Sequence, residues 1–466
     1  MSYVEMWRTT RLACRDAGGR ACPARALRQR LLLTMMSIQT VATKTFEGQK
    51  PGTSGLRKRV TVFEQEHYTE NFLQCILSAI PGGARGATLV VGGDGRYLSL
   101  PTVQKIVRLA AGNGVAKLII GQNGILSTPA ASHVIRLRKA TGGILLTASH
   151  NPGGPNADFG IKYNVQNGGP APETVTNKIY ELTTKIDHYL LQQGDDVDLS
   201  QVGAVSFGDL HIDVIDPIKD YVDYLSTIFD FDLIKSFLSS GQFKVRFDAL
   251  HGVTGPYARA LLVERFGLPD DAVQNWVPKP DFGGGHPDPN LTYAKSLVDA
   301  MKSESLNFGA ASDGDGDRNM ILGKDAFVNP SDSVAIIADW AERAIPYFKS
   351  GVRGVARSMP TSGAIDRVAK ARSSRCRRAG SSSATSWMLA ACRSVVKRAL
   401  ARAQTTSVRR TVCGLSWLGS TSWPLRTKST LARRWPMCCR RTTSNTAATS
   451  SAATTTKKWR VQVHRP

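Results

Sequence analysis

The segment 147–154, Thr-Ala-Ser-His-Asn-Pro-Gly-Gly, constrains this chain more than any other feature, because it directly follows the apolar run 144–146. An apolar strand that ends in a glycine-rich loop is typical of α/β proteins, which place their chemistry at strand ends. The proline and glycines turn the chain away, so we expect Ser149 to stand exposed beside His150. Such a serine suits a covalent phosphoryl or acyl carrier, and the plainer alternative is an ordinary Asn-Pro-Gly turn.

A second loop, 312–318, follows the small-residue run 307–311 and reads Ser-Asp-Gly-Asp-Gly-Asp-Arg. Its three carboxylates alternate with glycines and can converge on one hard cation, while Arg318 can pair with a phosphate. Three oxygen ligands leave room for waters and a phosphate, which favours magnesium over a dedicated calcium site. A solvated acidic turn is the alternative.

An EF-hand is excluded for the same loop. With Asp313 at position one, Arg318 stands where the required glycine belongs and Lys324 stands where the required glutamate belongs.

Two further segments suit a phosphate. Residues 50–58, Lys-Pro-Gly-Thr-Ser-Gly-Leu-Arg-Lys, combine hydroxyls, a flexible backbone and cations, which a phosphate oxyanion requires. Residues 160–164, Gly-Ile-Lys-Tyr-Asn, place a lysine in a strand-like segment, where a simple surface charge is the alternative.

The periodicity predicts an α/β fold. Residues 88–92 and 117–121 are short apolar strands, and 102–111 between them place their apolar residues on one helical face. Strand, helix and strand in this order imply a right-handed parallel crossover. The unit recurs where a helical segment around 294–303 lies between strands at 243–249 and 307–311.

The charge is distributed unevenly along the chain. The net charge of +23 and the pI near 9.9 favour a nucleic-acid partner at first sight. Residues 371–466, however, hold 20 of the 60 basic side chains and none of the 37 acidic ones, so residues 1–370 carry 40 basic and 37 acidic groups. The body of the chain is therefore nearly neutral.

Taken together and in order, these motifs resemble the α-D-phosphohexomutase superfamily, and its phosphoglucomutase branch in particular. The resemblance runs from Met36 to about Lys370. It implies four domains around one cleft, a phosphoserine, a bound Mg²⁺, and interconversion of glucose 1-phosphate and glucose 6-phosphate through glucose 1,6-bisphosphate. The segments that carry it are 50–60, 91–97, 147–154, 251–256, 313–320 and 357–363.

The resemblance also assigns roles to single residues. It implies that Ser149 is the phosphoserine and that His150 and Lys162 take part in proton transfer. The implied magnesium ligands are Ser149, Asp313, Asp315 and Asp317. The positions implied to line the phosphoryl-transfer site are Thr53, Ser54, Arg57 and Arg318. Cations at this point would stabilise a phosphoryl group in transfer.

The expected fold is a set of phosphohexomutase-type mixed-sheet domains in a layered α/β/α arrangement, with domains one and two intact, domain three truncated and domain four absent. We place domain one at 36–218, domain two at 219–341 and the start of domain three at 342–370.

Residues 371–466 show neither helical nor strand periodicity and hold five of the eight cysteines, so we expect them to be disordered. When common codons are read one base later, two segments of the family become the sequences at 375–385 and 395–405. The tail is therefore interpreted as an out-of-frame translation, with a natural nucleic-acid-binding arm as the alternative.

Residues 1–35 contain seven arginines against Glu5 and Asp16. They are expected to be a disordered extension read from an upstream methionine, with a mitochondrial transit peptide as the alternative. No apolar run approaches the roughly 20 residues that a membrane helix needs. Cys75 is the one cysteine between Met36 and Lys370, which fits a reducing compartment.

The leading hypothesis is a cytoplasmic, monomeric phosphoglucomutase that uses Mg²⁺ and glucose 1,6-bisphosphate, acts on sugar phosphates, binds no specific nucleic acid or membrane, and is inactive in the chain as written. The alternatives are a catalytically dead remnant that binds metal and sugar phosphate, and a basic nucleic-acid-binding protein.

Overall fold

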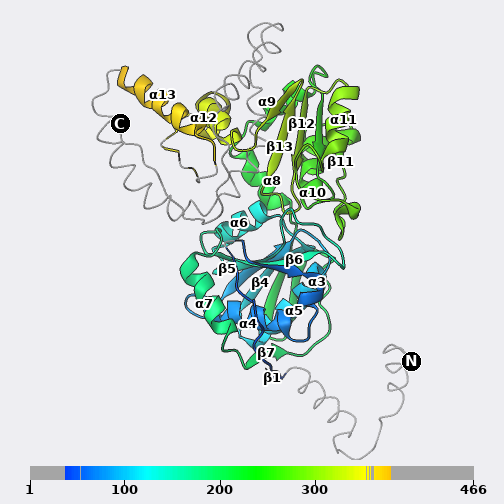
Figure 1. Cartoon of the computed structure of the whole chain (residues 1–466), viewed down its shortest axis with the longest axis vertical. Helices are drawn as coiled ribbons and strands as arrows, with labels where there is room; N and C mark the ends of the chain where they lie inside the picture. Colours follow the sequence, from blue (N-terminus) through cyan, green and yellow to red (C-terminus); the bar gives the residue numbers. More distant parts are fainter. Residues whose placement is uncertain (1–36, 53, 353, 356, 358–360, 379–466) are drawn as a thin grey trace, which may run out of the picture.

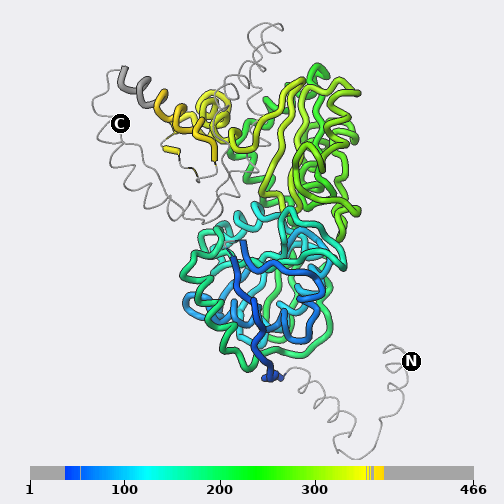
Figure 2. Tube along the Cα trace, viewed as in Figure 1, coloured from blue at the N-terminus to red at the C-terminus, as the bar shows by residue number. Residues whose placement is uncertain are grey.

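The computed structural model of the chain describes residues 37–52, 54–352, 354–355, 357 and 361–378. These residues form two stacked α/β units, and a further helix follows the second unit (Figure 1). The chain completes the first unit before it enters the second, so the colours of the trace do not interleave (Figure 2). Thr53, the extension at 1–35 and the tail from 379 onward lie outside the described residues.

The first unit is built on a seven-stranded mixed sheet. Strands β5, β3, β4 and β9 are parallel, and antiparallel strands extend the sheet at both edges. The predicted strand, helix and strand are confirmed as β3, α5 and β4, and the two strands pair in parallel. In sheet order the strands are β2 (Leu56–Arg59), β6 (Asp158–Val165), β5 (Gly142–Leu146), β3 (Thr88–Gly93), β4 (Lys117–Ile125), β9 (Leu210–Ile215) and β8 (Gly203–Phe207).

Helices cover both faces of this sheet. Alternation along β3 points Leu89 and Val91 into one buried cluster and Val90 into another. The first cluster contains the helices α3 (Val60–Phe63), α4 (Tyr68–Ala79), α5 (Ser99–Gly112) and α7 (Glu173–Thr183), and the second contains α6 (Thr128–Leu137). A separate ribbon pairs β1 (Ile38–Ala42) with β7 (His188–Gln192).

The second unit is built on a five-stranded sheet in which β10 lies parallel to both of its neighbours. In sheet order the strands are β11 (Val273–Gln274), β10 (Val245–Asp248), β12 (Phe308–Ser312), β13 (Asn319–Gly323) and β14 (Ala326–Val328). The helices are α8 (Lys219–Ser226), α9 (Phe231–Leu238), α10 (Thr254–Ala258), a π-helix (Arg259–Arg265), α11 (Lys295–Ser303) and α12 (Ser333–Ala344); short 3-10 turns lie at Asp270–Ala272, Phe282–Gly284 and Pro346–Phe348. The layered mixed-sheet α/β/α architecture predicted from the sequence is confirmed.

The two units share one core. A single cluster of buried side chains runs from Val90 and Leu145, through Ala130 and Val134 of α6, to Leu225 of α8 and on into the second unit. Helix α6 begins cleanly because the Ser127 side chain accepts a hydrogen bond from Ala130 N at 3.2 Å. This shared packing fixes the ends of the two sheets relative to each other.

Beyond the second unit the structure departs from two expectations. The boundary expected at residue 341 falls inside α12, which continues to Ala344. Helix α13 (Ala364–Arg378) packs on α12 and includes residues 371–378, where disorder was expected. Extending an existing helix adds one hydrogen bond for each residue fixed, and the residues here are mainly alanine, arginine and serine, so the helix continues past Lys370.

Among the described residues no helix combines the length and apolar character that a membrane span requires.

The first core should be sensitive to Phe159, which is fully buried and packs edge-on against Phe63 at 5.0 Å between ring centroids. We expect Phe159→Ala to lower the free energy of unfolding by about 3–5 kcal/mol, because it leaves a cavity in close-packed surroundings. Urea unfolding of the full chain measures this. Phe327→Ala is the control, since Phe327 is 38% exposed and its loss should cost less than about 1 kcal/mol. Equal losses from the two variants would contradict the placement of the core.

Candidate active site

The serine loop follows β5, and it presents Ser149 in a left-handed backbone conformation with φ of +58°. Its N–H donates to Thr147 Oγ1 at 2.8 Å and its carbonyl accepts from Arg96 Nη2 at 2.8 Å. Ser149 is only 2% exposed, so the expectation that it stands exposed is wrong. The sequence could not reveal the reason, which is that a loop of the second unit covers the serine.

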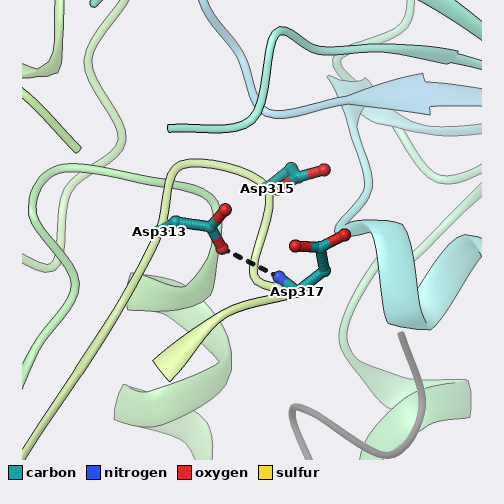
Figure 3. Close-up of side chains that lie close together, drawn as sticks. All are labelled: Asp313, Asp315 and Asp317. Atoms are coloured by element: carbon teal, nitrogen blue, oxygen red, sulfur yellow. Dashed lines mark hydrogen bonds between the residues drawn. The ribbon is translucent and has the colours of Figure 1, made fainter. Parts of the chain in front are cut away.

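That covering loop connects β12 to β13 and carries the three aspartates (Figure 3). One carboxylate oxygen from each of Asp313, Asp315 and Asp317 lies within 4.8 Å of the others. The loop is tightened because Asp313 Oδ1 accepts from Asp317 N at 2.9 Å and from Arg318 N at 2.8 Å. The alternation seen in the sequence therefore does bring the carboxylates together.

The two loops meet directly. Ser149 Oγ donates to Asp313 Oδ2 at 2.8 Å, and Thr128 Oγ1, at the start of α6, donates to Asp315 Oδ2 at 2.8 Å. Lys162 Nζ, from β6, lies 4.0 Å from the same Asp315 oxygen. Lys162 is 5% exposed, so it is not a simple surface charge. The site is thus assembled from both units.

The negative charges of the three aspartates repel one another. Burial, together with the nearby charges of Asp315 and Asp317, raises the pKa of Asp313 well above its usual value. Burial also acts to raise the pKa of Asp315, but Lys162 and the hydrogen bond from Thr128 outweigh it and leave that pKa lowered. Like charges held this close in a buried position favour an added proton or a cation.

The donor set fits a hard divalent cation. Three carboxylates and a serine hydroxyl offer oxygen atoms only, which magnesium and calcium prefer. Asp315 Oδ1 is buried and makes no hydrogen bond within the described part of the chain, so it keeps free lone pairs in the cluster. The four residues predicted as metal ligands, Ser149 and the three aspartates, could therefore hold such an ion.

Basic side chains surround the carboxylates. Arg57 on β2 lies near Arg318. Burial lowers the pKa of the Arg57 guanidinium, although the nearby charge of Asp315 acts to raise it. Its Nε has no hydrogen-bond partner among the described residues. Ser54 is exposed in the turn just before β2, close to Arg57 in the chain. A dianionic phosphate at this point would meet fixed positive charge.

His150 is half-buried beside this cluster. Burial, followed by the charge of Arg318, lowers the pKa of its imidazole to about 4, and Nδ1 has no hydrogen-bond partner in the described region. Its ring lies 6.5 Å from that of His286, which stacks on Tyr293. Asp288 lies in the same loop as His286, 3.9 Å from Arg318.

Several of these residues were given no role from the sequence. Arg96 and Asp94 lie in the predicted motif 91–97, and charged residues just after an apolar strand were a usable signal. Thr128, Phe282, His286 and Asp288 gave none, because only the tertiary structure brings their loops to the serine.

An apolar cavity lies next to this site. Its volume is about 70 Å³, and it lies behind the loop of residues 313–318, here called the metal loop, between the second sheet and its helices. Its walls are almost entirely apolar. It includes Leu225, Tyr257 and Phe308 among its lining residues. Apolar walls cannot replace the hydration of a phosphate, so the polar cluster at Ser149 is the better candidate for anion chemistry.

Comparison with known proteins agrees with this geometry. Residues 48–190 match the family described as phosphoglucomutase/phosphomannomutase, alpha/beta/alpha domain I, and residues 219–326 match domain II of the same family. The chain belongs to the phosphoglucomutase/phosphomannomutase family.

Named relatives are similar over the same region. The chain is 61% identical over 338 residues to the phosphoglucomutase of Aspergillus fumigatus, covering 72% of this chain and 61% of that protein. It is 59% identical over 351 residues to phosphoglucomutase 2 of Saccharomyces cerevisiae, covering 73% and 62%. A crystal structure of Paramecium parafusin, a phosphoglucomutase in its open form, is similar with 45% identity and a TM-score of 0.68, covering 72% of this chain and 62% of that one. The chain thus spans about three-fifths of the length of these relatives.

The carboxylate cluster should govern cation affinity. We expect Asp315→Ala to raise the Mg²⁺ dissociation constant about a hundredfold, since a unit charge within a few ångström of a cation is worth a few kcal/mol in a partly buried site. Calorimetric titration of the full chain measures it. Asp299→Ala, which removes an exposed carboxylate paired with Lys295 on α11, is the matched control and should leave the affinity unchanged. Equal affinities in Asp315→Ala and the parent would contradict the metal site.

The lowered pKa of His150 has a measurable consequence. The unfolded chain takes up this proton near pH 6.5 and the folded chain only near pH 4, so stability should fall as the pH drops through that window. We expect the parent to lose more stability between pH 7 and pH 5 than His150→Gln does in urea unfolding. An imidazole resonance of His150 that titrates at or above pH 6 would contradict this.

Proposed function

We propose that this chain is a phosphoglucomutase by descent, which interconverts glucose 1-phosphate and glucose 6-phosphate through a phosphoserine at Ser149 and a glucose 1,6-bisphosphate intermediate. The observation that carries the proposal is the hydrogen bond from Ser149 Oγ to Asp313 Oδ2, which holds a nucleophilic hydroxyl against a carboxylate cluster ringed by basic groups. Its support also comes from relatives named phosphoglucomutase at about 60% identity.

In this proposal the protein contributes charge and position. A phosphoryl group leaving Ser149 Oγ spreads negative charge over its oxygens, and Arg57, Arg318 and Lys162 stand around that point. Magnesium held by Asp313, Asp315, Asp317 and a Ser149 oxygen would supply further positive charge. These charged groups are fixed in place, so they lower the barrier to phosphoryl transfer without having to reorganise during the reaction.

Proton transfer completes the step. The sugar hydroxyl attacks phosphorus, the bond from phosphorus to Ser149 Oγ breaks, the hydroxyl proton goes to a base and the serine oxygen receives a proton. We assign the base to His150, whose imidazole is neutral at pH 7, and the acid to Lys162, which is buried beside Asp315. Thr53 and Ser54 complete the proposed phosphate-binding segment with Arg57.

The proposal extends to the setting of the protein. One relative is named as a cytoplasmic phosphoglucomutase of Zea mays, and we place this chain in the cytoplasm as a monomer with sugar phosphates as partners and no specific nucleic acid. A net charge of +3 over residues 1–370 supports that last point.

Turnover needs more than the phosphoryl site. A bisphosphate intermediate must reverse its orientation, so a second, remote phosphate has to be gripped while the first reacts at Ser149. Residues 371–466 carry no acidic side chain and show neither helical nor strand periodicity, so we propose that they do not supply this second site and that the chain as written accepts a phosphoryl group but turns over poorly.

We expect purified protein treated with glucose 1,6-bisphosphate and Mg²⁺ to gain one phosphate, mapped by mass spectrometry to Ser149, while Ser149→Ala gains none.

A coupled assay for glucose 6-phosphate should give far lower rates for the chain as written than for a version whose third and fourth domains are taken from a relative. Phosphate only on other serines would reject the phosphoserine. Equal rates would reject the account of turnover, and phosphorylation without turnover in either version would favour a catalytically dead binding protein.

A further inference from the structure

We propose that Asp94, Arg96 and Thr147 form a clamp that holds Ser149 in its left-handed conformation, so that its hydroxyl faces Asp313. We call these three residues the serine clamp. They act as positioning residues, since they contact the backbone of Ser149 and not a reacting atom. Their effect on phosphoryl transfer rests on the proposed function, whereas their effect on the backbone does not.

The backbone of Ser149 requires such support. Its φ of +58° lies in the left-handed region, which a residue with a Cβ adopts rarely and keeps only where surrounding contacts fix it. No glycine relieves the strain at this position. The conformation is nevertheless what turns Oγ toward Asp313 at 2.8 Å.

Thr147 holds the N–H of Ser149. The threonine hydroxyl has one hydrogen, which it donates to Asp94 Oδ2 at 2.6 Å, and its lone pair therefore accepts from Ser149 N at 2.8 Å. Asp94 and Thr147 are both buried, so water does not compete for these bonds.

Arg96 holds the carbonyl of Ser149 and the chain that follows it. Its side chain is fully buried and pairs with both oxygens of Asp94, with Nε at 3.0 Å from each. Its remaining donors reach Ser149 O at 2.8 Å, Asn151 O at 3.3 Å and Asp158 O at 2.9 Å. One planar, charged group thus fixes three carbonyls: two in the serine loop and one at the first residue of β6.

The clamp is also braced from the second unit. The Phe282 ring lies 5.1 Å from the Arg96 guanidinium, and a Cβ at Gly153 or at Gly314 would come within 2.9 or 3.1 Å of that ring. Phe282 is buried and therefore packs against the serine loop and the metal loop at once. The same contact that steadies Arg96 sets the spacing of Ser149 and Asp313.

A purely space-filling role for Thr147 makes a different prediction. If only its volume mattered, valine would replace it well and serine would leave a small void. If its hydroxyl positions Ser149, the order is reversed. Comparing Thr147→Val with Thr147→Ser therefore separates the two roles.

The experiment compares these variants with Thr69→Val in the full chain. Thr69 is as buried as Thr147 and donates to Phe63 O at 2.7 Å, far from the loop along the chain, so its loss costs a similar hydrogen bond without touching Ser149. The measurements are hydrogen exchange of the Ser149 amide, urea unfolding, and the rate at which Ser149 takes phosphate from glucose 1,6-bisphosphate.

We expect Thr147→Val to speed exchange at Ser149 and to slow its phosphorylation by at least about tenfold each, since about that factor follows from one lost buried hydrogen bond. Thr147→Ser should stay within about threefold of the parent because it restores the hydroxyl. Thr69→Val should lower global stability alone. Equal exchange in the valine and serine variants, or in the two valine variants, overturns the clamp.

A parent that takes no phosphate rejects the proposed function, and the exchange comparison still decides the clamp. If Thr147→Val does not fold, Phe282→Leu takes its place: it keeps apolar volume but removes the ring beneath Arg96. Faster exchange at Ser149 in that variant supports the clamp, and unchanged exchange overturns it.

Discussion

The meeting of two loops from separate sheets is the constraint on which the rest of the site depends. The serine loop follows β5 of the first sheet, and the metal loop follows β12 of the second sheet. The two loops meet where the units join, so Ser149 Oγ reaches Asp313 Oδ2. The approach is close enough that a Cβ on Gly314 would lie 2.8 Å from Ser149 O. Glycine is therefore required for steric reasons, independently of turn geometry.

Electrostatics accounts for the composition around that contact. Holding three carboxylates side by side, two of them buried, is unfavourable unless cations compensate, and Lys162, Arg57 and Arg318 supply the compensation. The same basic groups suit a phosphate, so a single arrangement serves both purposes. The apolar core that α6 and α8 share holds the serine loop and the metal loop at a fixed distance from each other.

Membership of the phosphoglucomutase/phosphomannomutase family places this arrangement in context. The matched domains I and II are those that carry the serine loop and the metal loop. The chain spans about three-fifths of the length of its named relatives. Binding the far end of a sugar phosphate is a separate requirement, because it needs contacts remote from Ser149.

Local sequence alone predicted several elements and singled out three aspartates that lie together in the structure. Apolar periodicity located β3, α5 and β4, and alternating aspartates identified the metal loop, because both signals depend on residues close together in the chain. The burial of Ser149, the support from Arg96 and the approach of Phe282 depend on contacts between segments more than 50 residues apart. No local pattern encodes such contacts, since they follow from how two sheets pack. For that reason the sequence pointed to the candidate site residues, and only the tertiary structure decided how they are held.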